Sequence, residues 1–385
     1  MTPPRNKLRI ALVAPHIFLH RDILPQVIFS PGQLVIDLAE GLQQLGVSVT
    51  LFSPGPVDVA VPNIAADLTY FERELAGRGD TYLDLLKKHP FTFVTLARQV
   101  QTEMIAKAYA AANNNEFDIV HIYTNEEDTA LPFAKLCKKP VVFTHHDPFN
   151  FLVKYKNVFP KYKHLNWISV SYAQRVGMPA GTNWVGNVYH GLAPDRFSFV
   201  ESPRGDYIAY FGRIIQPKGL HLAIAAAQKA GLKLKIAGKH YTGYKDTYWR
   251  EQIQPQLSDC VEYVGFIKDD AQKQDFLGNA KALIVPSIYD EPFGMVAIEA
   301  LACGTPVLCL DSGALPEIIA DGVNGYVITK NHDSSETIAH LANAITKIDA
   351  ISRKDCRASF EKSFTLKNMA QGYADIYNIT KSVLI

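Results

Sequence analysis

Two glutamates, Glu291 and Glu299, stand eight positions apart in the stretch YDEPFGMVAIEALACGTPVL, residues 289–308. Glu291 belongs to a Pro-Phe-Gly loop, whereas Glu299 falls among apolar residues with the spacing of a buried helix. Burying a carboxylate in such a helix is costly unless a partner compensates its charge. That partner is either a basic side chain elsewhere in the fold or a ligand with hydroxyl groups or positive charge.

The helix that follows the loop offers a place for an anion. Phe293 or Gly294 opens this predicted helix, so unpaired N–H groups from Gly294 to Ala297 face the loop with the positive end of the helix dipole. A glycine at position 294 lets a phosphate approach the backbone closely. Carboxylates accept hydrogen bonds from sugar hydroxyls, so the two glutamates would reach the two ends of a diphosphate-linked ligand. In the plainer alternative, Glu299 pairs with an Arg or Lys and Glu291 is solvated.

A second motif, AYFGRIIQPKGLHLAI at residues 209–224, carries two basic residues. A predicted strand runs into Gly212-Arg213, and the loop after it leads through Lys218 into a helix. Ligands of open α/β sheets bind at the carboxyl ends of strands. Arginine offers a bidentate fork for phosphate and lysine a mobile point charge. Alone, such a pair is more often exposed or paired with an acidic neighbour; beside the two glutamates it predicts a diphosphate clamp.

Length and composition limit the class of protein. A chain of 385 residues suggests two domains, and 48% apolar with 20% charged residues is ordinary for a soluble globular enzyme. A net charge of +1 gives no indication of a nucleic-acid partner. Five cysteines without a CxxC pair favour reduced thiols in a cytosol, with neither a disulfide framework nor a zinc site. We find no signal peptide and no apolar run of the roughly 20 residues that span a bilayer, so we expect a cytoplasmic protein.

The hydrophobic pattern predicts two parallel sheets in series. In the first half, apolar runs predict strands at 8–15, 47–54, 117–124, 140–146 and 167–171, with a helix at 32–46. In the second half, strands are expected at 207–213, 232–238, 261–266, 281–287, 306–310 and 325–328, with helical stretches between them. The runs are continuous rather than alternating, as expected when helices cover both faces of a parallel sheet.

This pattern gives an α/β protein with two doubly wound, Rossmann-like domains facing a central cleft. We place the first domain at 1–192 and the second at 205–365, because the Pro-, Gly- and Ser-containing stretch 189–207 is typical of a boundary. A C-terminal helix at about 366–385 is expected to pack back on the first domain.

The order of motifs FGR…PKG, VGF and VPSIYDEPFGMVAIEALACGTPVLCLDSGALPEIIADGVNGYVI resembles family 4 of the retaining glycosyltransferases, which have the GT-B fold. The resemblance is specific over about residues 205–330 and weaker in the N-terminal half. It implies that Glu299 binds the ribose hydroxyls, that Glu291 contacts the transferred sugar, and that Arg213 and Lys218 hold the diphosphate. It further implies a donor-binding set made of Gly32, Gly212, Phe266, Ile267, Phe293, Gly294, Met295, Val296 and Glu299, with Phe266 and Ile267 beside the nucleobase.

The N-terminal half departs from the family in one loop. Relatives often carry a Gly-Gly pair after the first strand, whereas VIFSPGQLVIDLAEGL has only Gly32, which we expect to open the helix. PVVFTHHDP matches the place of a histidine near the transferred sugar, and the resemblance favours His146, two residues past Thr144. If the strand continues through both histidines, alternation turns His145 the other way, to pack or to cap the neighbouring loop. A metal site from His145, His146 and Asp147 is disfavoured because three adjacent residues rarely converge on one ion.

The segment FLVKYKNVFPKYKHLNW, residues 151–167, interleaves lysines with aromatic residues. It has two interpretations: contact with a membrane surface or an acceptor, or a solvated basic face whose aromatic side chains pack inward. We favour the second.

Together with the predicted clamp, the resemblance implies a transferase that moves a hexosyl group from a nucleoside-diphosphate sugar to a hydroxyl acceptor; retention is implied by the resemblance alone. Neither a metal nor another cofactor is expected, because the basic pair and the helix dipole already oppose the charge of the leaving group. The chain lacks Asp-x-Asp, a G-x-G-x-x-G after the first strand, and a P-loop. The alternatives are an epimerase or phosphorylase of similar architecture, or a catalytically silent sugar-binding protein that would have lost the clamp. The nucleobase, the sugar, the acceptor and the oligomeric state are not specified.

Overall fold

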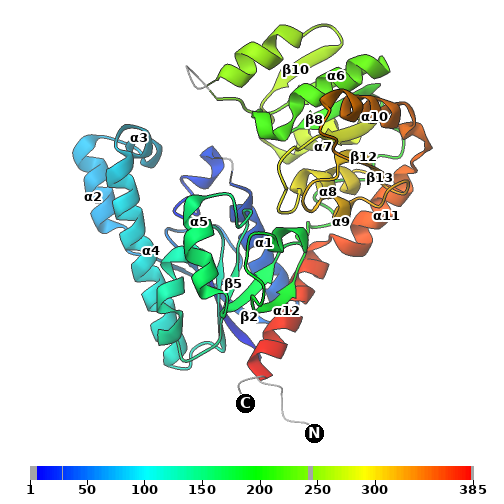
Figure 1. Ribbon diagram of the computed structural model, residues 1–385. Coiled ribbons are helices and arrows are strands. Elements are labelled where there is room, and N and C mark those ends of the chain that lie inside the picture. The colour runs from blue at the N-terminus through cyan, green and yellow to red at the C-terminus, as the bar shows by residue number, and fades with distance from the viewer. Residues whose placement is uncertain (1–6, 28, 242–245, 383–385) are drawn as a thin grey trace. The chain divides into compact units, whose positions relative to one another are not determined.

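The computed structural model describes residues 7–27, 29–241 and 246–382, which form two compact units (Figure 1). The first unit contains the chain up to Val170, Arg175–Val188, and the chain from Leu366 onward. The second contains Ser171–Gln174 and Tyr189–Thr365. The stretch after Tyr189, in which we placed the domain boundary, therefore packs with the second unit.

The first unit is built on a seven-stranded parallel sheet with the order β3-β2-β1-β4-β5-β6-β7. Its strands are β1 (Arg9–Val13), β2 (Ser48–Ser53), β3 (Asn63–Ala65), β4 (Ile119–Tyr123), β5 (Val141–Thr144), β6 (Asn166–Ser169) and β7 (Trp184–Asn187). The five predicted strands are confirmed. The sequence missed β3 and β7, which are the edge strands; edge strands are not covered like central ones, and neither has a continuous buried run.

The helices of the first unit include four that the sequence pattern did not reveal, those between residues 69 and 158. The unit's helices are α1 (Ser30–Gln44), α2 (Thr69–Arg78), α3 (Tyr82–Lys88), α4 (Pro90–Asn113), α5 (Val153–Val158) and α12 (Leu366–Ser382), with α2, α3 and α4 lying between β3 and β4. The C-terminal helix α12 packs on α1, where a side chain at Gly41 would meet Leu366 and Ala370. A buried hydrogen bond of 2.6 Å between the Tyr377 hydroxyl and Nδ1 of His121 also ties α12 to β4.

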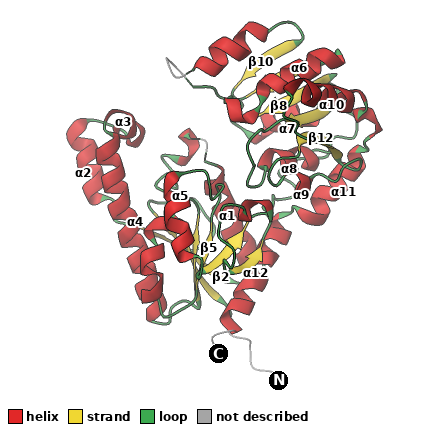
Figure 2. Ribbon diagram, in the orientation of Figure 1, coloured by secondary structure: helices red, strands yellow, loops and turns green. Residues whose placement is uncertain are grey.

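The second unit contains a six-stranded parallel sheet with the order β10-β9-β8-β11-β12-β13 (Figure 2). Its strands are β8 (Tyr207–Phe211), β9 (Lys233–Ala237), β10 (Val261–Gly265), β11 (Ala282–Val285), β12 (Val307–Leu310) and β13 (Gly325–Ile328). Its helices are α6 (Leu220–Ala230), α7 (Asp270–Gly278), α8 (Met295–Ala302), α9 (Leu315–Ile318), α10 (Ser334–Thr346) and α11 (Arg353–Ser363). The predicted strands are confirmed here as well. The helix expected at 313–322 is only the single turn α9.

Both sheets have the doubly wound arrangement that the sequence predicted. In each, the first strand along the chain has its second neighbour on one side and a later strand on the other, so the strand order reverses beside β1 and beside β8. Ligands of such sheets bind at the carboxyl ends of the strands, next to this reversal. The loops after β1 and β4, and those after β8 and β11, are therefore the places to look for a site. Among the helices of the described residues, none is long and apolar enough to cross a membrane.

Candidate active site

The two loops beside the reversal of the second sheet are joined by an ion pair. Glu291, in the loop between β11 and α8, is 6% exposed, and its Oε1 lies 2.5 Å from Nζ of Lys218, in the loop after β8. Ser287 donates to the same oxygen, and the Tyr289 hydroxyl donates to Oε2 at 2.8 Å. Glu291 is therefore not solvated, and two of the residues selected from the sequence meet directly.

Glu299 follows the other alternative that the sequence left open. It lies in α8, is 7% exposed, and its Oε1 is 2.9 Å from Nζ of Lys273 in α7. The ammonium of Lys273 also lies 5.0 Å from the centre of the Phe211 ring, at the end of β8. Lys273 compensates the buried charge. Its helix was predicted, but a lysine within that helix has no distinctive spacing, so sequence reasoning missed it.

The backbone at the start of α8 has the conformation expected where a phosphate comes close to the chain. Gly294 caps the helix with a φ of 116°, a value that L-residues with a side chain rarely adopt. Met295 and Val296, the first two helical residues, are half-buried. The expectation of free N–H groups as far as Ala297 is wrong at its last position, because the Ala297 N–H donates to the Gly294 carbonyl at 3.0 Å.

Neighbouring segments fix the loop that carries Glu291. The Phe293 ring is 2% exposed and packs on His190, with ring centres 4.8 Å apart. Ser171 donates to the carbonyl of Pro292 at 2.7 Å, and Ala314 N–H donates to the carbonyl of Glu291 at 2.9 Å. Phe293 therefore anchors the loop through its side chain, so any contribution it makes to ligand binding comes from the backbone.

The remaining donor-side residues lie at strand ends of the same sheet. Gly212 and Arg213 directly follow β8, where the Gly212 N–H donates to the Ala237 carbonyl at 3.1 Å and Arg213 is exposed. Phe266 and Ile267 directly follow β10; Phe266 is 40% exposed and Ile267 is half-buried. Both pairs are thus at carboxyl ends of strands, as the sequence predicted.

Gly32, the donor-side candidate of the first unit, does not open its helix. The helix α1 begins at Ser30, which places Gly32 inside the first turn, with its N–H donating to the Phe29 carbonyl at 3.0 Å. A side chain at this position would lie 2.6 Å from Leu24. The N–H group of Gly32 is therefore already used, and the Leu24 side chain would have to move to admit a larger residue there.

The tandem histidines have distinct surroundings, although for a different reason than expected. β5 ends at Thr144, so strand alternation does not extend through both residues. His145 is fully buried, its Nδ1 lies 3.1 Å from Oε2 of Glu127, and burial lowers the pKa of its imidazole to about 4. His146 is 7% exposed and packs edge-on against Tyr123, with ring centres 4.4 Å apart. Packing, not alternation, separates the two side chains.

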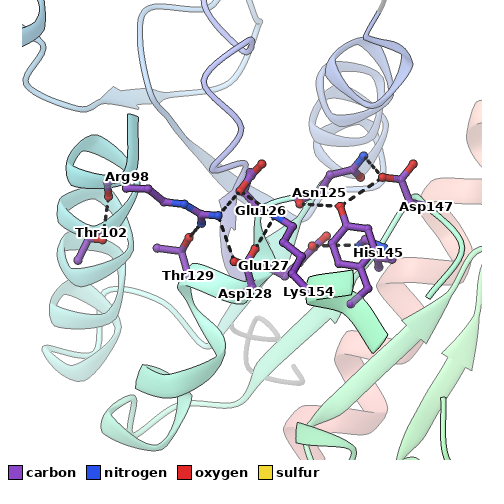
Figure 3. A network of polar contacts seen from close by, with 11 residues as sticks. Arg98, Thr102, Asn125, Glu126, Glu127, Asp128, Thr129, His145, Asp147 and Lys154 are labelled. Carbon is purple, nitrogen blue, oxygen red and sulfur yellow. Dashed lines mark hydrogen bonds and ion pairs between the residues drawn. The ribbon is translucent and has the colours of Figure 1, made fainter. Parts of the chain in front are cut away.

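A polar network lies beside His145 at the carboxyl ends of β4 and β5 (Figure 3). Arg98 of α4 and Lys154 at the start of α5 each lie within 3.3 Å of Glu126 and of Asp128, in a closed ring of four ion pairs. This ring could not be predicted from the sequence, because its members come from three separate segments.

The lysine-rich segment 151–167 largely follows the interpretation that we favoured. Its aromatic residues Tyr155, Phe159 and Trp167 are buried, and Lys154 belongs to the ring of ion pairs. Phe151, which precedes α5, and Val153, its first residue, differ, since they are 56% and 74% exposed.

Comparison with known proteins identifies the family. The model of Glycosyl transferases group 1 matches residues 194–362, and that of Glycosyltransferase Family 4 matches residues 32–177. This chain is a family 4 glycosyltransferase with the GT-B fold. A phosphatidyl-myo-inositol mannosyltransferase from Mycobacterium leprae is 24% identical over 377 residues, which cover 92% of this chain and 91% of that protein. An alpha-maltose-1-phosphate synthase from Mycolicibacterium smegmatis is 28% identical over 154 residues, or 37% of this chain and 38% of that protein.

Solved structures share the fold of this glycosyltransferase. Sucrose-phosphate synthase from Thermosynechococcus elongatus superposes with a TM-score of 0.70 at 21% identity, covering 98% of this chain and 100% of that chain. HepE from Anabaena, in complex with UDP and glucose, superposes with a TM-score of 0.68 at 18% identity, covering 97% and 100%.

Proposed function

We propose that the enzyme transfers a hexosyl group from a nucleoside-diphosphate sugar to a hydroxyl acceptor, with retention of the anomeric configuration and without a metal. The observation that carries the proposal is the Lys218–Glu291 pair, which stands with Arg213 at the reversal of the second sheet. A cation and a carboxylate in contact suit a ligand that combines a diphosphate with a sugar.

The diphosphate end of the donor binds to the two basic residues and to the start of α8. Arg213 is exposed and ready to form a bidentate contact, while Lys218 is held by Glu291 near the same strand ends. Gly294 and the first N–H groups of α8 add the positive end of the helix dipole. Together these groups stabilise the charge that develops on the leaving diphosphate, which removes the need for a metal ion.

The nucleoside end is bound further along the same sheet. Glu299 accepts hydrogen bonds from the ribose hydroxyls, with Lys273 holding its carboxylate in place. The base lies against Phe266 and Ile267, the two residues that directly follow β10. The relative crystallised with UDP and glucose supports a donor of this class.

The transferred sugar is oriented by Glu291 and by His146. Glu291 keeps its carboxylate fixed through Ser287 and Tyr289, so it meets a sugar hydroxyl without a change of rotamer. His146 follows β5, which is separated from β1 by β4, at the carboxyl edge of the first sheet, where we expect the acceptor hydroxyl to bind. A silent sugar-binding protein would not need this clamp, and an epimerase would need acid and base carboxylates around the sugar.

A thermal-shift panel of UDP-, GDP- and ADP-sugars, run with and without EDTA, tests the donor. A bound donor raises the melting temperature by mass action, so one nucleotide class should stabilise the wild type and the exposed-lysine control Lys229→Ala, but stabilise Lys218→Ala much less. The stabilising donor is then used in a transfer assay, with the anomeric configuration of the product read by NMR. Absence of stabilisation by every donor would overturn the proposal. Activity lost in EDTA and restored by Mn²⁺ or Mg²⁺ would overturn its metal-independent part.

A further inference from the structure

The loops that follow β4 and β5 are fastened to each other on both sides of His146. On one side, His145 Nδ1 lies 3.1 Å from Oε2 of Glu127. On the other side, Asp147 accepts hydrogen bonds from the Asn125 amide at 3.0 Å and from the Tyr155 hydroxyl at 3.3 Å (Figure 3). The segment that carries His146 is therefore held by its two neighbours in the chain.

Glu127 differs from the buried carboxylates Glu291 and Glu299, each of which pairs with a lysine. Its neighbours Glu126 and Asp128 form ion pairs with Arg98 and Lys154. The side chain of Glu127 instead points into the fold, is 0% exposed, and contacts His145. Its other oxygen, Oε1, has no hydrogen-bond partner within the described part of the chain. A buried ionised carboxylate in this position would be expensive.

Complete burial of both side chains favours their neutral forms. Burial raises the pKa of the Glu127 carboxyl and lowers the pKa of His145 to about 4. We therefore assign a carboxyl O–H of Glu127 that donates to Nδ1 of His145. The rings of Phe149, Tyr155 and Phe159 enclose the imidazole with centres 4.4–5.1 Å away, so the hydrogen bond sets the orientation of a ring that is otherwise held by packing.

We propose that Glu127 is a positioning residue for glycosyl transfer, which acts through His145 to hold the 145–147 segment so that His146 presents its imidazole to the sugar. The inference rests on the proposed role of His146. A misplacement of about 1 Å in a group that orients substrate can cost about 10²-fold in rate, so a hydrogen bond that fixes the backbone next to His146 has a kinetic effect. The turn that leads to Glu127 contains Thr124 at a φ of 108°, a strained conformation that neighbouring contacts must maintain.

Three variants separate positioning from simple stabilisation. Glu127→Leu keeps the volume and removes the hydrogen bond, Glu127→Gln keeps an N–H that can donate to His145, and Gln101→Leu is a matched control that removes another buried polar group, in α4. We expect Glu127→Leu to lower kcat by about 10- to 100-fold with a donor KM within about threefold of wild type. Glu127→Gln should return kcat to within about threefold of wild type, and Gln101→Leu should leave it unchanged.

The outcomes distinguish this inference from the proposed function. If the wild type neither binds a donor nor transfers a sugar, the proposed function fails. If the wild type is active and Glu127→Leu retains its kcat per folded molecule, or if Glu127→Gln is as impaired as Glu127→Leu, the role of Glu127 is wrong. Should Glu127→Leu not fold, the double variant Glu127→Leu/His145→Phe replaces both partners by apolar groups, which is close to neutral for folding. The same loss of kcat is expected in it, and wild-type turnover would again overturn the proposal.

Discussion

The Lys218 ammonium lies 2.5 Å from the Glu291 carboxylate, and this ion pair joins the loop after β8 to the loop after β11. A diphosphate would compete with Glu291 for the same ammonium. If Lys218 turns toward the phosphate, Glu291 keeps its hydrogen bonds from Ser287 and Tyr289 and gains capacity to accept one from a sugar hydroxyl. If the enzyme binds a nucleoside-diphosphate sugar as proposed, the pair links occupation of the phosphate site to the hydrogen bonds that Glu291 offers the sugar.

The diphosphate clamp can be tested by a double-mutant cycle. Lys218→Ala and Arg213→Ala should each lower kcat strongly, by about 10²-fold or more, because their charge is needed most as the diphosphate leaves. The double variant should lose less than the product of the two single losses, since both residues hold one group. Steady-state kinetics on the four proteins measure the coupling. Independent losses, or wild-type turnover in either single variant, would contradict the clamp.

Substitutions of Glu299 and of Lys273 should have different effects, the first on donor affinity and the second on the melting temperature. Glu299→Gln removes charge-assisted hydrogen bonds to ribose that contribute about 1.5–3 kcal/mol, so the donor Kd should rise at least about tenfold. Lys273→Met leaves the buried Glu299 charge without its ammonium partner, so it should mainly lower the melting temperature. Calorimetric titration and thermal unfolding give both quantities. Unchanged donor affinity in a folded Glu299→Gln enzyme would remove Glu299 from the site.

Gly313 should be required for the position of Glu291. It has a φ of 56°, and a Cβ added there would lie 2.2 Å from the carbonyl oxygen and 2.4 Å from the nitrogen of Glu291. Gly313→Ala must therefore displace the Glu291 backbone, and we expect kcat to fall together with stability. Gly322→Ala is the matched control, because Gly322 also has a positive φ, 75°, but its Cβ would meet nothing within 4 Å. Equal kinetic effects of the two substitutions would show that backbone strain alone, and not the contact with Glu291, limits the enzyme.

The sequence predicts those parts of the fold in which the pattern of apolar residues matches their burial in the folded protein. Central strands such as β1 and β11 are continuous apolar runs because helices cover both faces of the sheet, and they were predicted within a few residues. The edge strand β3 is short and only partly buried, so it carries no such pattern. The helix α4 went unrecognised, although it is the longest in the described part of the chain.

Within the site, residues in local motifs could be predicted, whereas Lys273, the partner of Glu299, could not. Arg213, Lys218, Glu291 and Glu299 stand in local motifs. The partner of Glu299 is Lys273 from another helix, α7, and its place in the sequence does not indicate this contact. Glu127 is hidden in the same way, since its acidic neighbours suggest a solvated turn, and only the fold shows that its side chain alone is directed inward.

The tandem histidines should respond differently to truncation. His146→Ala should lower kcat by roughly 10²-fold with little change in melting temperature, if its ring orients the sugar. His145→Ala leaves a cavity among Phe149, Tyr155 and Phe159, so it should lower the melting temperature more than His146→Ala does. Its kinetic effect should follow that of Glu127→Leu, because both break the same hydrogen bond. A larger kinetic loss for His145→Ala than for His146→Ala would transfer the direct role to His145.

Three fully buried histidines should make the protein sensitive to mild acid. Burial lowers the pKa of His121 and of His190 to about 3, and that of His145 to about 4, whereas all three titrate near 6.5 in the unfolded chain. Between pH 6.5 and about 4 the unfolded state therefore binds more protons than the folded state. The stability that these residues contribute is fully present above pH 6.5 and falls as the pH falls, with a limiting slope of about 1.4 kcal/mol per pH unit for each histidine.

Glu127 acts in the opposite sense, because its raised pKa favours folding when the carboxyl is protonated, and its contribution is lost as the pH rises above its unfolded value of about 4.5. Above pH 4.5 the change of stability with pH due to Glu127 therefore cancels about that of one of the three histidines. Urea unfolding between pH 7.5 and 4.5 measures the net slope, and His121→Gln, which removes a single titrating group, should reduce it by about 1.4 kcal/mol per pH unit between about pH 6 and 4.5. A slope equal to that of the wild type would show that His121 already carries a proton in the folded enzyme.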